Sequence, residues 1–317
     1  MGRQGETRVG GFLFKRVLFI SAFFAVGMLW GCGGKRMGPV APAAPLQPPG
    51  PVGAGQILDV KAGGPILFDD LIHSLASKDV VFVGEIHDNP AHHLIQTQIL
   101  QALLNRWGAN AAIGMEFFPR PAQAHLDGYI KGELTESEFL GAADWQKLWG
   151  YPYYLYRPLM LAARERFIRI LAINAPQEIV KKVAREGLAN LTGEERAQIA
   201  SDIDLGNEPH REFVRKVFGE HAHSDLKSFG RFYEAQAVWE ETMAETISLY
   251  LGPKGKKMVV FAGNGHIIHK FGVPDRTAKR IPISTATVVP YPAGDHADVE
   301  GLADYIWFTP GHPRSRP

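Results

Sequence analysis

The sequence predicts an α/β fold: a largely parallel central sheet flanked by helices, with a helical cap inserted between the third and fourth strands. Short runs rich in β-branched residues alternate with longer amphipathic stretches, which is the pattern of parallel strands joined by helices. About 250 residues carry this alternation, enough for one large domain with a full core. The chain shows no internal repeat.

Six apolar runs are the strand candidates, and a helical signal follows each of the first four. The runs are short and rich in β-branched residues, as strands of an α/β domain are. The six runs are Val80–Gly84, Ala111–Met115, Ile168–Ile173, Lys257–Phe261, Pro282–Val289 and Tyr305–Phe308.

Two helices begin with a recognisable capping sequence. Asp88 or Asn89 can cap a helix whose first residue is Pro90, and Asn174-Ala175-Pro176 opens a helix over Gln177–Glu186. The stretch from about 192 to 251 is mostly helical, and it is the predicted cap. Its last part is the long segment Phe229–Tyr250. The first helix has an apolar face formed by Leu94, Ile95, Ile99, Leu103 and Trp107.

Residues 1–31 have the features of a secretory signal peptide. A basic region precedes Val17–Gly31, an uncharged run shorter than the roughly 20 residues that cross a membrane. Leu29-Trp30-Gly31-Cys32 resembles the lipobox of bacterial lipoproteins, in which the Cys is acylated with chains such as palmitate. We therefore expect a lipid anchor on Cys32 and a place in the cell envelope, and Gly33 favours the outer membrane. An uncleaved N-terminal anchor is the alternative.

Composition divides the rest of the chain and limits its chemistry. Residues 32–64 are rich in Gly, Pro and Ala and read as a flexible tether, 65–310 as the folded domain and 311–317 as a tail. Cys32 is the only cysteine, so the domain has no disulfide and no thiolate catalysis. Residues 32–317 carry a net charge of −2, which does not indicate a nucleic-acid partner.

Polar side chains follow four of the predicted strands. In parallel α/β sheets, ligands bind outside the carboxyl ends of the strands, so these side chains are expected to converge. Glu85 and His87 stand two residues apart on extended chain and leave it on the same face. Together with Glu116 and His266 they could bind a divalent metal ion or act as acid and base. Structural roles, such as a buried salt bridge or a turn histidine, are the alternative. Asn174 follows the remaining strand.

Other histidines are weaker candidates. His92 and His93 lie in the first turn of a predicted helix, where one is expected to face the sheet edge and the other water. His221 and His223 have a ligand-like spacing, but they lie in a charged, loop-like stretch.

The segment Trp145–Arg157 contains six aromatic residues within 12 positions. Its rings either pack a loop over the core or form a wall for a large, flat, apolar ligand. In the second case a tyrosine hydroxyl is available for iron and Arg157 for a carboxylate.

Several motifs resemble those of the ChaN-like haem-binding lipoprotein family, within the Tiki and erythromycin-esterase-like superfamily. The resemblance extends from about residue 66 to 310, with the motifs in order. They are Val-Gly-Glu-Ile-His-Asp-Asn at 83–89, Gly-Met-Glu-Phe-Phe at 114–118, the segment 145–157, Leu-Ala-Ile-Asn at 171–174, Phe-Tyr-Glu-Ala-Gln-Ala-Val-Trp-Glu-Glu-Thr-Met-Ala at 232–244 and Gly-Asn-Gly-His at 263–266.

The resemblance implies an exported lipoprotein that binds haem and assists iron uptake, as a homodimer or with an outer-membrane haem receptor. It also implies that a tyrosine ligates ferric haem, and a histidine of the cap could be a second ligand. The chain has no Cys-x-x-Cys-His sequence, so covalent haem attachment is excluded. The candidate ligands are Tyr151, Tyr153, Tyr154 and Tyr156.

Two functions from different classes remain open on the sequence. In the first, the protein is a haem carrier whose pocket is the aromatic segment, and the Glu/His cluster is structural or secondary. In the second, it is a metal-dependent hydrolase. Glu85 or Glu116 would then be the general base, and His266 would bind the metal or polarise the scissile carbonyl.

Overall fold

The computed structural model describes residues 53–220, 228–252, 255–293 and 299–311. The predicted signal peptide, Cys32, the first part of the tether, His221, His223 and residues 312–317 lie outside the described residues. None of the helices in these ranges combines the length and apolar character needed to span a membrane.

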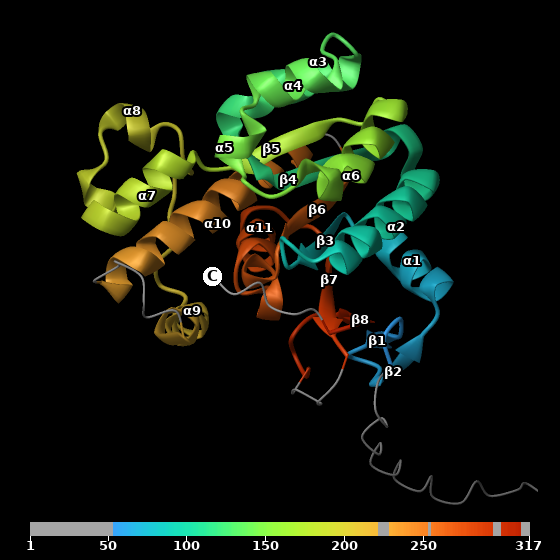
Figure 1. Ribbon diagram of the computed structural model, residues 1–317. Coiled ribbons are helices and arrows are strands. Elements are labelled where there is room, and N and C mark those ends of the chain that lie inside the picture. Colours follow the sequence, from blue (N-terminus) through green and yellow to red (C-terminus); the bar gives the residue numbers. More distant parts are fainter. Residues whose placement is uncertain (1–52, 221–227, 253–254, 294–298, 312–317) are drawn as a thin grey trace, which may run out of the picture. The chain divides into compact units, whose positions relative to one another are not determined.

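Within the described residues, eight strands form a single mixed sheet in the order β2-β1-β8-β7-β3-β6-β4-β5 (Figure 1). All pairs from β8 to β5 are parallel, whereas β1 runs antiparallel to both β2 and β8. The α/β fold and the six predicted strands are confirmed. These are β3 (Val80–Glu85), β4 (Ala111–Pro119), β5 (Ile170–Asn174), β6 (Lys257–Gly263), β7 (Thr285–Pro292) and β8 (Tyr305–Thr309).

Two strands lie in or next to the stretch predicted as a tether. They are β1 (Ile57–Asp59) and β2 (Gly64–Ile66). Ile57 and Leu58 are buried because β1 pairs with β8 and extends the sheet. The last residues of the predicted tether therefore belong to the folded unit.

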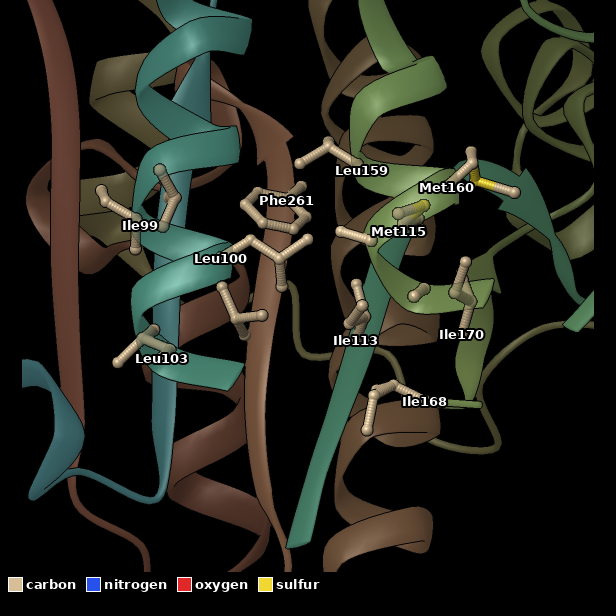
Figure 2. Close-up of a cluster of buried hydrophobic side chains, with 14 of the residues drawn as sticks. Ile99, Leu100, Leu103, Ile113, Met115, Leu159, Met160, Ile168, Ile170 and Phe261 are labelled. Atoms are coloured by element: carbon tan, nitrogen blue, oxygen red, sulfur yellow. The ribbon is translucent and has the colours of Figure 1, made fainter. Parts of the chain in front are cut away.

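One face of the sheet is covered by α1 (Phe68–Ala76), α2 (Pro90–Trp107) and α6 (Tyr153–Glu165). Figure 2 shows part of this core, with Leu100 of α2 and Leu159 of α6 beside the strand residue Phe261. The predicted cap of α2 is confirmed, since the Asn89 side chain accepts a hydrogen bond from Ala91 N. Leu94, predicted on the buried face, is instead 59% exposed.

Smaller helices continue this side of the molecule. They are α3 (Gln123–Lys131), α4 (Glu136–Ala142) and α5 (Trp145–Leu148). Short 3₁₀ helices cover Gly108–Asn110, Arg120–Ala122, Leu188–Asn190, Asn264–His266 and Ile268–Lys270.

The opposite face is covered by the C-terminal half of α10 (Phe229–Leu251) and by α11 (Val273–Arg280). Between β5 and α10 lie α7 (Gln177–Glu186), α8 (Gly193–Arg196) and α9 (Glu208–Glu220). The segment predicted as a helical cap is thus helical. However, Met243, Ala244 and Ile247 of α10 pack on the sheet itself, so a separate cap is not confirmed.

A side chain closes the outer edge of β5. The Gln123 amide donates a hydrogen bond to Ile170 O at 2.9 Å, and its oxygen accepts one from Ala172 N at 2.8 Å. These are the two backbone groups that a further strand would have used. The side-chain amide of Gln123 thereby forms the hydrogen bonds that these two backbone groups of the edge strand would otherwise lack.

Candidate functional site

Glu85 lies at the carboxyl end of β3 and is almost completely buried. Its Oε1 atom accepts a hydrogen bond from the Tyr156 hydroxyl at 3.0 Å and lies 2.7 Å from His87 Nδ1. Its Oε2 atom accepts one from Gln96 Nε2 at 2.7 Å. Both carboxylate oxygens are therefore engaged, and they fix the orientation of the His87 ring.

His87 stands among aromatic rings. The centroid of its ring lies 4.9 Å from that of Trp149 and 5.1 Å from that of Tyr151. Gly263 leaves room for it, because a Cβ atom there would lie only 3.0 Å from His87 Cε1. Burial alone would lower the pKa of His87, but the hydrogen bond that its ring donates to Glu85 and the charge of Glu116 raise that pKa above its ordinary value. The two carboxylates therefore stabilise the protonated form of the ring.

Glu116, on β4, and His266, after β6, form a second pair. Glu116 Oε2 accepts a hydrogen bond from Gly263 N at 2.6 Å, and its Oε1 lies 3.4 Å from His266 Nε2. On the other side of the ring, His266 Nδ1 lies 3.2 Å from Glu240 Oε1. Asn174 supports β4, since its amide donates to the carbonyl of Glu116. The imidazole of His266 is thus placed between two carboxylates.

The pKa values of this pair are displaced in opposite directions. Burial would raise the pKa of Glu116, but the charge of His266 and its contact lower it to about 2. Burial would lower the pKa of His266, but Glu116 and Glu240 raise it to about 10. Both groups are therefore charged at neutral pH.

These pKa values predict how stability depends on pH. Because the pKa of Glu116 falls from 4.5 to about 2, its contribution is complete above 4.5 and is lost as pH falls through 2. The pKa of His266 rises from 6.5 to about 10, so its contribution is complete below 6.5 and is lost as pH rises through 10. We expect the free energy of unfolding in urea to fall between pH 6.5 and 10, and less so in a His266→Gln variant. Equal slopes in the two proteins would contradict this.

Behind His266 lies a buried ionic network that the sequence did not predict. Glu240 Oε2 lies 3.2 Å from both Arg276 Nε and His210 Nε2. Arg276 also donates to Glu241, which in turn pairs with Arg280 at 2.5 Å. One sequence feature could have indicated this network, since two adjacent glutamates interrupt the apolar sequence of α10. A charged pair in such a helix needs buried partners, but the sequence does not say which.

The four predicted residues come together as two adjacent carboxylate–imidazole pairs. Among the described residues, no group of three or more His, Cys, Asp or Glu side chains is placed to hold a metal ion. The oxygens of Glu85 and Glu116 accept hydrogen bonds from Tyr156, Gln96 and Gly263.

The prediction for His92 and His93 was wrong in one respect, because both are buried. His92 Nδ1 accepts a hydrogen bond from Ile86 N at 2.9 Å, and His93 Nε2 lies 3.0 Å from the carbonyl oxygen of His87. Both rings therefore support the loop that carries His87, and neither faces water.

The four candidate tyrosines differ in exposure. Tyr156 is 1% exposed and is bound to Glu85, and the hydroxyl of Tyr153 is buried while its ring packs on Trp145. Burial raises the pKa of both phenols. Tyr151 is half-buried, whereas Tyr154 is 68% exposed. The segment thus combines both predicted roles: some rings pack on the core, and others face the surface.

Arg157, the candidate partner for a ligand carboxylate, lies on the surface of α6. Its Nε atom donates to both carboxylate oxygens of Glu136, at 2.8 and 3.0 Å. Within the described residues, no hydrogen bond from its Nη atoms is found, so these donors stay available.

Two depressions flank this region. One, beside Glu116 and between Trp149 and Trp239, has a volume of about 20 Å³, which is room for about one water molecule. The other is an open hollow of about 400 Å³ beside α6, lined by Tyr154 and Arg157 among others. Pockets for ligands of the size of a cofactor span roughly 300–1,000 Å³. The second depression falls in that range, whereas the first lies far below it.

Several known proteins are similar to this chain. The chain is similar to ChaN of Campylobacter jejuni, a structure titled for cofacial haem binding (TM-score 0.61, 21% identity, 79% of this chain and 95% of that chain). It is also similar to an erythromycin esterase (TM-score 0.46, 14% identity, 76% and 77%). A chloroplastic protein of Arabidopsis thaliana, Reticulata-related 5, is 24% identical over 76% of this chain. The chain spans about a third (35%) of that relative's length.

The likeness to Campylobacter ChaN, at 21% identity and a TM-score of 0.61, shows the fold alone. The family is established by a different comparison, since the family model described as "Haem-binding uptake, Tiki superfamily, ChaN" matches residues 71–277. This match covers most of the described residues, including Glu85, His87, Glu116 and His266. The chain belongs to the ChaN family of the Tiki superfamily.

Proposed function

We propose that this protein binds haem non-covalently on the side of the molecule that carries the aromatic segment. The observation that supports this most directly is the match to a haem-binding family over residues 71–277. The side chains present fit the group: Tyr151 and Tyr154 are accessible phenols, and Arg157 is an accessible cation. When bound, haem would supply a ferric iron, and a tyrosine such as Tyr151 or Tyr154 would be the side chain to hold it.

We further propose a cellular role in haem or iron uptake at the cell envelope. Its support is the sequence around Cys32, which has the features of a lipid-anchored protein, followed by a tether and the folded domain. The helices between β5 and β6 would act as a cap beside the carboxyl edge of the sheet. A second copy of this chain, in a homodimer, or an outer-membrane haem receptor would be the partner.

A hemin titration of the full chain, followed by absorbance, tests the proposed function. We expect a saturable shift of the Soret band at a fixed stoichiometry. A His87→Ala, His266→Ala double variant should keep its haem affinity within a few-fold, because this proposal gives the two histidines no part in binding haem. Adsorption that does not saturate would overturn the proposal.

A further inference from the structure

Helix α6 ends on a phenylalanine in the left-handed backbone conformation. The end of the helix is a Schellman motif, since Ile168 N donates to Ala163 O at 2.9 Å and Phe167 N donates to the carbonyl three residues before it at 3.1 Å. Phe167 thus occupies the position at which glycine is usual, with a φ of 54°. Three other helices, α2, α3 and α7, end on glycines at positive φ, which are Gly108, Gly132 and Gly187. Strain of this kind at Phe167 indicates that the side chain itself has a use.

The side chain of Phe167 does not contribute to the core. It is 74% exposed and belongs to none of the hydrophobic clusters that the described residues form. A second apolar side chain, Leu249 in the last turn of α10, is 71% exposed. The two segments are neighbours, because the guanidinium of Arg169 lies 5.8 Å from the ring centroid of Tyr250. Exposed apolar groups that gather in this way mark a contact surface.

Both groups lie at the amino edge of the sheet, where β3, β4, β5 and β6 begin. These strands start side by side, since Val80 pairs with Met258 and Ala111 with Lys257. The segments at this edge are residues 76–79, 105–110, 164–169 and 255–257, and they hold seven basic residues and two acidic ones. The basic residues are Lys78, Arg106, Arg164, Arg166, Arg169, Lys256 and Lys257. The amino edge is therefore strongly basic.

The opposite edge, where the same strands end, has the reverse balance. Its segments are residues 85–89, 116–122, 174–178 and 263–272, and they hold two basic residues and four acidic ones. The charge of the sheet is thus divided between its two ends, although the folded domain as a whole is close to neutral. A charge difference of this kind orients a protein at a charged surface.

Cations around an exposed ring are suited to a membrane with anionic head groups. Arg106 and Arg166 are exposed, and neither has a carboxylate partner among the described residues. Basic side chains are attracted to anionic lipids, and aromatic rings enter the boundary between head groups and acyl chains. Neither Phe167 nor Leu249 lines one of the two depressions described above, so they offer no socket for a protein side chain. Protruding apolar groups suit a fluid apolar phase better.

We propose that the amino edge docks on a surface of anionic phospholipid, with the ring of Phe167 in the interface and the nearby arginines on the phosphates. The length of the chain permits this contact, since the 20 residues from 33 to 52 span at most about 70 Å between Cys32 and the folded unit. Docking in this way turns the carboxyl edge, and the candidate site with it, away from the lipid. The inference goes beyond haem binding and does not depend on it.

Phe167→Trp in the full chain tests the docking. It is mixed with phosphatidylglycerol–phosphatidylcholine vesicles whose acyl chains carry bromine, which quenches tryptophan on contact. We expect the emission added by the new tryptophan, taken as the difference from the wild-type spectrum, to fall about twofold or more, because the ring lies at the acyl-chain boundary. Arg106→Gln with Arg166→Gln should reduce this quenching, and vesicles of phosphatidylcholine alone should not produce it.

Leu67→Trp is the matched control. Leu67 is also 74% exposed, but it follows β2 at the other end of the sheet, where Ile66 pairs with Ile57. The emission that this variant adds should not change with vesicles. Phe167→Gly should unfold at a higher urea concentration than wild type, because glycine adopts a φ of 54° without strain.

Sedimentation with the vesicles shows whether the chain is on the lipid. A chain that does not sediment, or equal quenching at positions 67 and 167, overturns the proposal. A chain that sediments with the emission at position 167 unquenched overturns it too, and leaves the amino edge as a surface for a protein partner. A lower urea midpoint in Phe167→Gly would mean that the ring stabilises the fold, and would overturn the argument from strain.

Discussion

Glu240→Gln is expected to lower the free energy of unfolding by about 3–5 kcal/mol, the range for removing one partner of a buried ion pair. Glutamine preserves size but removes the charge that Arg276 and His266 share. Its amide nitrogen would also face a donor, because Glu240 oxygens meet Arg276 on one side and His266 with Gln236 on the other. Urea unfolding of the full chain, monitored by circular dichroism, measures the effect.

A surface glutamate provides the control for this prediction. Glu212→Gln removes an ion pair with Arg215 in which both side chains are more than half exposed. Such pairs contribute about 0–1 kcal/mol, so this variant should be close to wild type. Equal stabilities of the two variants would mean that the Glu240 network does not stabilise the fold.

Gly272→Ala is the second substitution with a large expected effect. A Cβ atom at Gly272 would lie 2.4 Å from the carbonyl oxygen of His266 and 2.8 Å from Glu240 Oε1. The first of these contacts is with backbone, which can move only if the turn carrying His266 moves. Overpacking of this kind costs about 1–3 kcal/mol and sometimes more. We expect a lower urea midpoint and a displaced His266 side chain.

Gly265→Ala is the matched control in the same turn, because no atom lies within 4 Å of a Cβ built there. Its free energy of unfolding should lie within about 0.5 kcal/mol of the wild-type value. The nuclear magnetic resonance signals of the His266 ring should shift in Gly272→Ala and stay in place in Gly265→Ala. The reverse pattern would contradict the packing described for this turn.

The sheet could be predicted where strands are long and apolar. β3 and β6 are continuous runs buried on both faces, and such runs differ clearly from the amphipathic helices around them. β1 and β2 could not be predicted, because three residues carry no period and Gly64-Pro65 resembles the tether before it. The burial of β1 depends on β8, which lies far away in sequence.

The candidate site could be predicted in part. Glu85, Glu116 and His266 converge because parallel strands deliver their carboxyl ends to one edge, which follows from topology alone. Glu240 and Arg276 come from helices, and the face that a helix buries depends on its packing. For the tyrosines of α6, too, exposure depends on which face of the helix packs on the core. Tyr154 and Tyr156 are two residues apart and equally aromatic, yet one is exposed and the other buried.

The side chain that closes the sheet at β5 also limits how copies of this protein can associate. Gln123 occupies the donor and acceptor of that edge, and Pro65 on the opposite edge strand has no N–H to offer. Within the described residues, neither end of the sheet therefore presents an unbroken row of free backbone donors and acceptors to a second chain. Where two copies associate, we expect them to do so through helical or loop surfaces and not by joining their sheets.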